Sequence, residues 1–157
     1  MSIPRKITEF LDSQGVSYEF RAHPPTYTSQ KTAQAEHISG KTFAKTVMVV
    51  ADRRLLMAVV PASHHVDLNR LRQMLGSQEV RLATEHEFVN MFPGCDLGAM
   101  PPLGNLFGRD VVADVSLKQI PTITFNAGTH TETISIKFQD FVRIVKPRMG
   151  SFAEMTH

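Results

Sequence analysis

The chain's plainest structural signal is the stretch FAKTVMVVADRRLLMAVVPA, residues 43–62. Phe43 to Ala51 and Leu55 to Ala62 are rich in apolar and β-branched residues, and the polar Asp52-Arg53-Arg54 joins them. Two such runs with a short polar connection are typical of a β-hairpin. In the first run both alternating faces are apolar, so we expect this strand to be covered on both sides. The stretch therefore predicts a buried hairpin in a layered fold.

Helices and strands interleave along the rest of the chain. Helical periodicity and capping residues predict helices over Pro4–Gln14, from Thr28 or Ser29 to about His37, over Leu68–Leu75 with Asp67 as the cap, over Glu85–Met91 with Thr84 and Glu87 as a capping box, and over Gln139–Val145. Apolar runs bounded by turn residues predict strands over Val16–Phe20, Val80–Ala83, Val111–Val115, Pro121–Ala127 and Thr131–Phe138. Several neighbouring strands are joined by short turns, so we expect a mixed sheet flanked by helices, which is an α+β fold.

Composition limits the class of protein. The 157 residues are 42% hydrophobic and 20% charged, which fits one globular domain over residues 1–157. A net charge of +2 permits contact with a nucleic acid without the strong basic patch of a dedicated binder. The start of the chain lacks a signal-peptide pattern, and no run reaches the ~20 apolar residues of a membrane span. We therefore expect a cytoplasmic protein that does not enter a membrane.

Lys45 lies at the start of the first hairpin strand, and Val47 and Val49 share its face. A lysine in that position either extends along the apolar surface to water or has its ammonium held in a pocket. The extended arrangement is the commoner one at a strand end. In a pocket, the cation would be directed at a phosphate or at a developing oxyanion. On the residues alone, both interpretations stay open.

Residues 93–108, PGCDLGAMPPLGNLFG, form a long connection rich in glycine and proline. Connections of this length between structured segments are often functional loops. Within it, Gly98 to Gly104 combines glycines, which allow close approach to the backbone, with two consecutive prolines, which stiffen the chain. Such a loop can present backbone amides to a carbonyl oxygen. A rigid turn over the core is the alternative.

His130 and Glu132 are two residues apart, so on a strand they share one face, as metal ligands do. Zinc deaminases combine His-x-Glu with Pro-Cys-x-x-Cys, a motif that a chain with the single cysteine Cys95 does not contain. His64 and His65 are adjacent and would face opposite ways on a strand. We therefore expect no metal and no other cofactor, and His130 is either a hydrogen-bonding pocket residue or a surface histidine of a hairpin.

A nucleophile is harder to find. The sequence has no Gly-x-Ser-x-Gly elbow and no glycine-rich phosphate loop of the Walker or dinucleotide type. Cys95 and His130 could form a Cys–His pair, although a lone cysteine beside Pro93 and Gly94 is more often structural. Asp114, in VVADVSL, is either a carboxylate at a strand end or turn, or a residue that lines a site.

Five segments occur in an order that resembles the YbaK/EbsC family. They are FAKTVMVV (residues 43–50), VVPA (59–62), VDLNRLRQMLG (66–76), GAMPPLGNLFG (98–108) and FNAGTHTETISI (125–136). The family includes the editing domain inserted in bacterial prolyl-tRNA synthetases and its free-standing relatives. The resemblance covers roughly residues 5–150 and rests on the ordered set of segments. It implies the YbaK-like fold, a mixed sheet flanked by helices.

The resemblance also implies the residues of a site. In the family, the key functional side chain is a lysine at the start of the second strand, and Lys45 matches it. The family's Gly-x-x-x-Pro loop corresponds to residues 98–102, and His130 resembles a pocket histidine that some alanine-removing members carry after a glycine. The resemblance thus implies Lys45, Gly98 and His130 as catalytic residues. The substrate-binding residues that it implies are Thr46, Ala99, Met100, Pro101, Pro102, Asp114 and Gly128.

The chemistry implied by the resemblance is hydrolysis of the ester of a mischarged aminoacyl-tRNA with a small amino acid, namely alanine, serine, threonine, cysteine or an analogue. An aminoacyl ester is already reactive, so positioning a water and stabilising the oxyanion suffice. Family members are thought to recruit a ribose hydroxyl of the terminal adenosine. Lys45 would then bind the nearby phosphate or carbonyl, and amides of the Gly98–Pro102 loop would hold the ester and the water.

Two other functions stay open at this point. A non-catalytic module would use the same groove for tRNA ends, nucleotides or a protein partner. A hydrolase that depends on Cys95 is the third possibility. For the leading hypothesis, the partners are the acceptor end of aminoacyl-tRNA and a synthetase. An edge strand is compatible with a monomer or a weak homodimer.

Overall fold

The computed structural model describes residues 2–24, 29–35 and 42–156. Its helices are α1 (Ile3–Ser13), α2 (Ser29–Ala35), α3 (Leu68–Leu75), α4 (Glu85–Phe88) and α5 (Phe138–Val145), with two 3-10 turns, η1 (Gly104–Leu106) and η2 (Val115–Gln119). Its strands are β1 (Tyr18–Ala22), β2 (Ala44–Ala51), β3 (Arg54–Pro61), β4 (His64–Val66), β5 (Val80–Leu82), β6 (Val111–Asp114), β7 (Thr122–Asn126), β8 (Glu132–Lys137), β9 (Arg148–Gly150) and β10 (Ala153–Met155). Within this part of the chain, no helix has the length and apolar character needed to cross a membrane.

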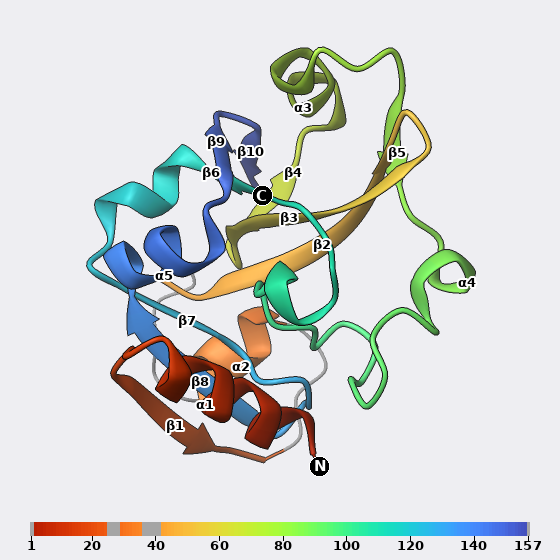
Figure 1. The fold of residues 1–157 in the computed structure, drawn as a ribbon. Helices are drawn as coiled ribbons and strands as arrows, with labels where there is room; N and C mark the ends of the chain where they lie inside the picture. The colour runs from red at the N-terminus through yellow and green to blue at the C-terminus, as the bar shows by residue number, and fades with distance from the viewer. Residues whose placement is uncertain (1, 25–28, 36–41, 157) are drawn as a thin grey trace.

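The strands form a five-stranded sheet in the order β5-β2-β3-β6-β9, a three-stranded sheet in the order β1-β8-β7, and the pair β10-β4 (Figure 1). In the larger sheet β2 pairs antiparallel with β3, whereas β6 runs parallel to both β3 and β9. The sheet is therefore mixed, and helices lie around it. The predicted α+β class is confirmed, and the predicted hairpin lies at the middle of the larger sheet.

The two faces of β2 pack against different groups of residues. Ala44 and Met48 belong to the main hydrophobic core, whereas Val47 and Val49 pack in a second cluster that includes Leu71 of α3. Each fully buried aliphatic side chain of this kind contributes roughly 1.5–3 kcal/mol of transfer free energy. The prediction that this strand is covered on both sides is confirmed. Because side chains alternate along a strand, Lys45 lies on the α3 side and Thr46 on the side of the main core.

The N-terminal helix begins and ends close to the prediction, but the first strand begins two residues later than predicted. Ser2 caps α1, since its side chain accepts a hydrogen bond from Arg5 N. At the other end Val16 N donates to Leu11 O (3.0 Å), so Val16 still belongs to the helix end. β1 therefore runs from Tyr18 to Ala22 instead of Val16–Phe20. For the second predicted helix, the cap at Thr28 and its end near His37 lie outside the described residues.

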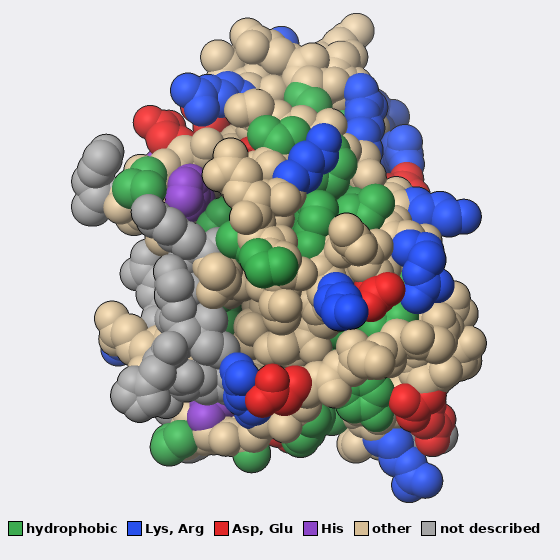
Figure 2. Space-filling model, turned by 90° about the vertical axis from the view of Figure 1, so that its left-hand side faces the viewer, with side chains coloured by type: hydrophobic (Ala, Val, Ile, Leu, Met, Phe, Trp, Pro, Cys, Tyr) green, Lys and Arg blue, Asp and Glu red, His purple; other side chains and the backbone are tan. Residues whose placement is uncertain are grey.

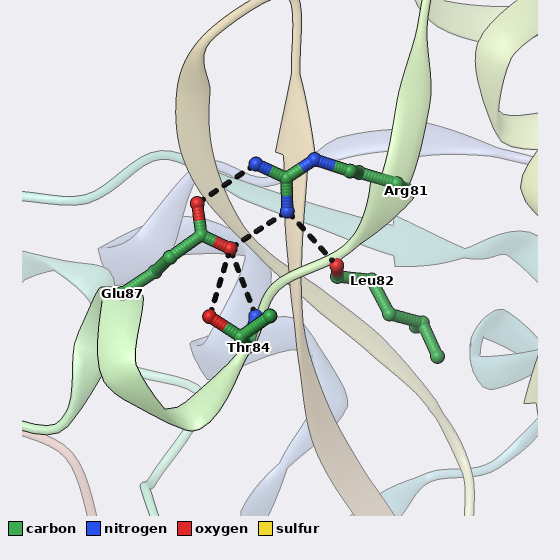
Figure 3. A network of polar contacts seen from close by, with 4 residues as sticks. All are labelled: Arg81, Leu82, Thr84 and Glu87. Carbon is green, nitrogen blue, oxygen red and sulfur yellow. Dashed lines mark hydrogen bonds and ion pairs between the residues drawn. The ribbon is translucent and has the colours of Figure 1, made fainter.

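Helix α4 is held against β5 by a small polar network (Figure 3). Glu87 accepts a hydrogen bond from Thr84 N (2.9 Å), as expected for the predicted capping box, and another from Thr84 Oγ1 (3.2 Å). The two Glu87 oxygens also accept from the two terminal nitrogens of Arg81, at 2.7 and 2.8 Å. The helix ends at Phe88 rather than Met91, because Met91 N donates to Phe88 O in a turn. The network thus holds α4, which precedes the connection of residues 93–108, in place beside β5.

This network predicts a pH-dependent contribution of Glu87 to stability. The hydrogen bonds from Arg81 and then Thr84 lower the pKa of Glu87 to about 2 from 4.5. Its stabilising effect is therefore fully present above pH 4.5 and is lost as the pH falls to about 2. We expect Glu87→Gln to lower the melting temperature at pH 7, and we expect the difference from wild type to shrink below pH 4.5 in thermal unfolding monitored by circular dichroism.

Glu9→Gln is a suitable control for that experiment. Glu9 pairs with Arg5 at 3.3 Å in an isolated, exposed i,i+4 pair on α1, which contributes little to stability. We expect it to change the melting temperature less than Glu87→Gln does. A Glu87→Gln difference that stays the same down to pH 2.5 would contradict the assigned ion pair.

Candidate functional site

Lys45 is half-buried on β2, directly opposite Val60 of β3. Burial lowers the pKa of its ammonium, and no charged group among the described residues adds to that shift. A partly desolvated ammonium without a fixed counter-ion keeps its hydrogen-bond donors available for an oxygen of a ligand. Lys45 is therefore neither a lysine fully extended into water nor part of a structural ion pair.

The start of β2 also joins the two larger sheets. Phe43 forms a parallel bridge with Thr124 of β7, and Thr124 N donates to Thr42 O (3.2 Å). Phe43 is fully buried in a small cluster with Ala33 of α2 and Ala62. The face on which Phe43 lies is therefore covered by α2. Lys45 follows Phe43 by two residues, so it lies on that same face.

The predicted loop and the predicted histidine come together at the turn between β7 and β8. Gly128 N donates to Ala99 O (2.9 Å), and Asp96 N donates to Gly128 O (2.8 Å). His130 N donates to Asp96 Oδ2 (3.2 Å). A Cβ placed on Gly98 would lie 3.8 Å from His130 Cε1. Gly98 and His130 are thus neighbours.

Burial separates the five residues of this loop into two groups. Gly98 is exposed, whereas Ala99, Met100, Pro101 and Pro102 are buried. Met100 belongs to the main core. The four buried residues therefore support the loop from the core side. What this loop can offer directly to a ligand is the backbone around Gly98, next to the half-buried His130.

Asp114 is held at the end of β6 by hydrogen bonds from within the protein. Its Oδ1 accepts hydrogen bonds from Phe152 N and Ala153 N, both at 2.8 Å, and its Oδ2 accepts from Ser116 N (3.0 Å). Burial alone would raise the pKa of Asp114, but the hydrogen bonds from Ser116, Phe152 and Ala153 outweigh it and lower the pKa. The carboxylate thus ends β6 and secures the C-terminal segment that forms β10. Its observed contacts are structural.

Asn126 was not singled out from the sequence. It is the last residue of β7 and only 6% exposed, and its Oδ1 has no hydrogen-bond partner among the described residues. Thr46 Oγ1, on the main-core side of β2, is also a buried atom without a hydrogen-bond partner among the described residues. The available signal was an amide at the same strand parity as Thr122 and Thr124, in a strand whose remaining residues, Ile123 and Phe125, are apolar.

Cys95 lies half-buried in the loop next to Asp96. Burial, and then the charge of Asp96, raise the pKa of its thiol to about 11. The thiol is therefore protonated at neutral pH, which does not suit a nucleophile.

We expect Cys95→Ser to leave hydrolytic activity unchanged, because the protonated thiol contributes no nucleophile. Steady-state kinetics of the variant beside wild type check this, with melting temperatures to verify folding. A folded Cys95→Ser protein without activity would instead support the hydrolase that depends on Cys95.

The structure describes no group of three His, Cys, Asp or Glu side chains placed as metal ligands within residues 2–24, 29–35 and 42–156. His130 lies in the turn before β8 rather than on a strand, so it does not share a strand face with Glu132, the first residue of β8. Glu132 accepts a hydrogen bond from Thr129 Oγ1 (3.2 Å). His65 lies 3.5 Å from Glu154 of β10, and His64 Nδ1 lies 2.9 Å from Ser63 Oγ. These contacts give the histidines and Glu132 partners within the protein.

Positive charge is spread over the surface rather than concentrated at Lys45. On the face in Figure 2, Lys and Arg side chains form small groups among neutral atoms, and several lie beside an acidic side chain. A hollow of about 650 Å³ at the far end of the β2–β3 hairpin is lined by four arginines, of which Arg54 pairs with Asp110 and Arg81 with Glu87. No predicted site residue lines that hollow.

The fold is that of a small α+β domain with a half-buried lysine on its central hairpin. Residues 23–144 match the family described as the aminoacyl-tRNA editing domain, and the chain belongs to this family. The family interpretation made from the ordered sequence segments is confirmed.

Relatives in two classes of protein align with parts of the chain. The multifunctional Ser/Thr-tRNA deacylase ProXp-y of Escherichia coli strain K12 is 32% identical over 98 residues, which is 62% of this chain and 58% of the deacylase. The proline–tRNA ligase of Lactiplantibacillus plantarum is 25% identical over 104 residues, 66% of this chain and 18% of the ligase. The chain therefore spans less than two thirds of these curated relatives.

Among solved structures, that of a proposed trans-editing enzyme for prolyl-tRNA synthetase superposes with a TM-score of 0.84. The superposition covers 98% of each chain at 20% sequence identity. At this identity the likeness concerns the fold, and it extends over nearly the whole described domain.

Proposed function

We propose that this protein hydrolyses the ester bond of mischarged aminoacyl-tRNA that carries a small amino acid: alanine, serine, threonine, cysteine or an analogue. The observation that carries the proposal is Lys45, a half-buried ammonium with a lowered pKa and no counter-ion among the described residues. Membership of the editing-domain family supports the reaction class. The name of the E. coli relative, a Ser/Thr-tRNA deacylase, supports the choice of small amino acids.

In the proposed reaction a water oxygen bonds to the ester carbonyl carbon, and the bond from that carbon to the ribose oxygen breaks. The ribose oxygen takes up a proton, and the products are the free amino acid and the tRNA. Lys45 holds the phosphate or the carbonyl oxygen, where its positive charge stabilises the developing oxyanion. The exposed backbone at Gly98 and the adjacent His130 position the ester and the water, assisted by a ribose hydroxyl of the substrate.

The other implied residues take supporting roles in this proposal. Thr46, with a buried hydroxyl that lacks a partner among the described residues, is assigned to substrate binding. Ala99, Met100, Pro101 and Pro102 hold the loop in place from the core. Asp114 and Gly128 keep the chain in position around the site through their contacts with Phe152 and Ala99.

A physical need for such an enzyme exists in translation. A synthetase pocket separates amino acids that differ by one methylene by only about 1–3 kcal/mol, so small amino acids are attached in error. A second site of smaller size can hydrolyse the wrong ester and exclude the larger correct one. We also propose that the protein acts in the cytoplasm on the acceptor end of tRNA, as a monomer or weak homodimer, with a synthetase nearby.

The test is a panel of tRNAs charged with alanine, serine, threonine, cysteine or proline. Ester loss is measured with and without the protein, and binding is measured on the same samples. We expect the protein to hydrolyse one or more of the small aminoacyl esters and to leave prolyl-tRNA intact. Binding without ester loss would instead favour a non-catalytic module that uses the same groove.

A further inference from the structure

Asn126 combines burial with an unsatisfied oxygen at the end of β7. The residue is 6% exposed, and its Oδ1 has no hydrogen-bond partner within the described part of the chain. Buried amide oxygens are nearly always paired, because an unpaired one loses its hydrogen bonds to water without replacement. An acceptor left open in this way is suited to a donor that arrives with a ligand.

The neighbouring polar side chains do not supply that donor. On the same face of the small sheet, the hydroxyls of Thr124 and Ser135 hydrogen-bond to each other at 2.6 Å. Thr133, the residue opposite Asn126 in β8, is fully buried. The hydroxyls of Thr124 and Ser135 thus satisfy each other, whereas the side-chain oxygen of Asn126 has no hydrogen-bond partner among the described residues.

Asn126 and Lys45 lie on the same side of the place where β2 and β7 meet, at the bridge between Phe43 and Thr124. The parallel bridge joins Phe43 to Thr124, and paired residues of parallel strands point to the same side. Two residues further along each strand are Lys45 and Asn126, which by the alternation of side chains lie on that side as well. Beyond the bridge, the ladder between β5 and β2 covers only Val49 to Ala51, so no described strand forms a ladder with the intervening edge of β2.

The two side chains have opposite hydrogen-bonding character. The ammonium of Lys45 only donates, whereas Oδ1 of Asn126 only accepts. A ligand that uses both must carry an acceptor and a donor close together. An aminoacyl ester does so, because its carbonyl oxygen and its α-amino group are attached to adjacent carbons.

We infer that Asn126 is a substrate-binding residue whose Oδ1 accepts a hydrogen bond from the α-amino group of the aminoacyl ester. The inference rests on the proposed deacylase function and specifies how that site recognises the aminoacyl part of its substrate. It explains why an amide oxygen is buried at this position without a hydrogen-bond partner among the described residues. Recognition of the amino group also distinguishes an aminoacyl ester from an ordinary acyl ester.

The test compares alanyl-tRNA with propionyl-tRNA, two esters that differ only in the α-amino group. Each rate is divided by the uncatalysed rate, because the amino group itself activates the ester. For wild type we expect a preference for the alanyl ester of about 10- to 100-fold in kcat/KM, the size typical of a lost hydrogen bond to a buried acceptor. Asn126→Leu, of similar shape but without an acceptor, is expected to abolish most of this preference.

Two further variants make the comparison specific. Asn126→Asp keeps an acceptor oxygen, so it should retain the preference for the alanyl ester. Thr124→Val removes a buried polar group from the same face and should also retain it. Melting temperatures verify folding, and Asn126→Leu is expected not to lower the melting temperature, since it removes an unpaired buried oxygen. If Asn126→Leu does not fold, Asn126→Ala takes its place.

The outcomes that overturn the inference differ from those that overturn the proposed function. A wild-type protein that hydrolyses both esters without preference overturns the inference and leaves the function intact. The same holds if Asn126→Leu slows both esters equally, which would indicate a contact with the ribose or a structural role. A wild-type protein that hydrolyses neither ester overturns the function and the inference together.

Discussion

Lys45→Ala is expected to lower kcat/KM for deacylation about 100- to 1000-fold, the usual cost of removing one group that stabilises an oxyanion. The protein should stay folded, because the side chain of Lys45 makes no ion pair among the described residues and the backbone pairing of β2 does not depend on it. Single-turnover hydrolysis of an accepted aminoacyl-tRNA measures the loss, and thermal unfolding measures the stability.

The lowered pKa of Lys45 predicts a trade-off between stability and activity. Burial disfavours its charged form in the folded protein, so at pH 7 the positive charge costs stability. Lys45→Met should therefore melt no earlier than wild type while it loses activity. Lys137→Ala, at an exposed lysine of β8, is a control that should keep full activity. A folded Lys45→Ala protein with undiminished turnover would remove Lys45 from the mechanism.

Gly128→Ala is expected to destabilise the protein by about 2–4 kcal/mol, the combined cost of a left-handed backbone and of overpacking. Gly128 is buried and has a φ of 89°, a conformation that an L side chain rarely adopts. A Cβ at this position would also lie 2.2 Å from Ile3 Cγ2 of α1. Chemical denaturation of wild type and variant measures the change in the free energy of unfolding.

Two comparisons separate the causes of that loss. Gly15→Ala places alanine at a φ of 68° with nothing within 4 Å, so it should show the backbone cost alone, about 1–2 kcal/mol. Combining Gly128→Ala with Ile3→Ala should cost less than the sum of the two single changes, because the overlapping side chain is gone. Equal stability of Gly128→Ala and wild type would mean that α1 does not pack on this turn as described.

Local patterns were sufficient for much of the fold. The alternation of apolar residues in FAKTVMVVADRRLLMAVVPA predicted β2 and β3 to within a residue. Asp67 and Gly76 predicted both ends of α3, since Asp67 accepts a hydrogen bond from Arg70 N and Gly76 adopts the left-handed conformation. These features depend on residues that are close in the chain, so the sequence carries them directly.

Other elements depend on contacts between distant segments. The three-residue strands β9 and β10 are too short for periodicity to show, and Asp114 secures β10 from 38 and 39 residues away in the chain. Likewise, the burial of Met100 in the main core could not be read from a loop rich in proline and glycine. For Asp114 and Met100, the residue type suggested a site, whereas packing decided their contacts.

The candidate site divides in the same way. The sequence predicted Lys45 on an apolar strand, a loop stiffened by two prolines, and a histidine in a hairpin. The order of these three features along the chain indicated that they belong to one site. Only the tertiary structure decided that Gly98 adjoins His130, and that the side-chain oxygen of Asn126 is buried without a hydrogen-bond partner among the described residues. Periodicity and capping act within a few residues of chain. Whether a buried polar atom has a partner depends on segments that meet only when the sheets come together.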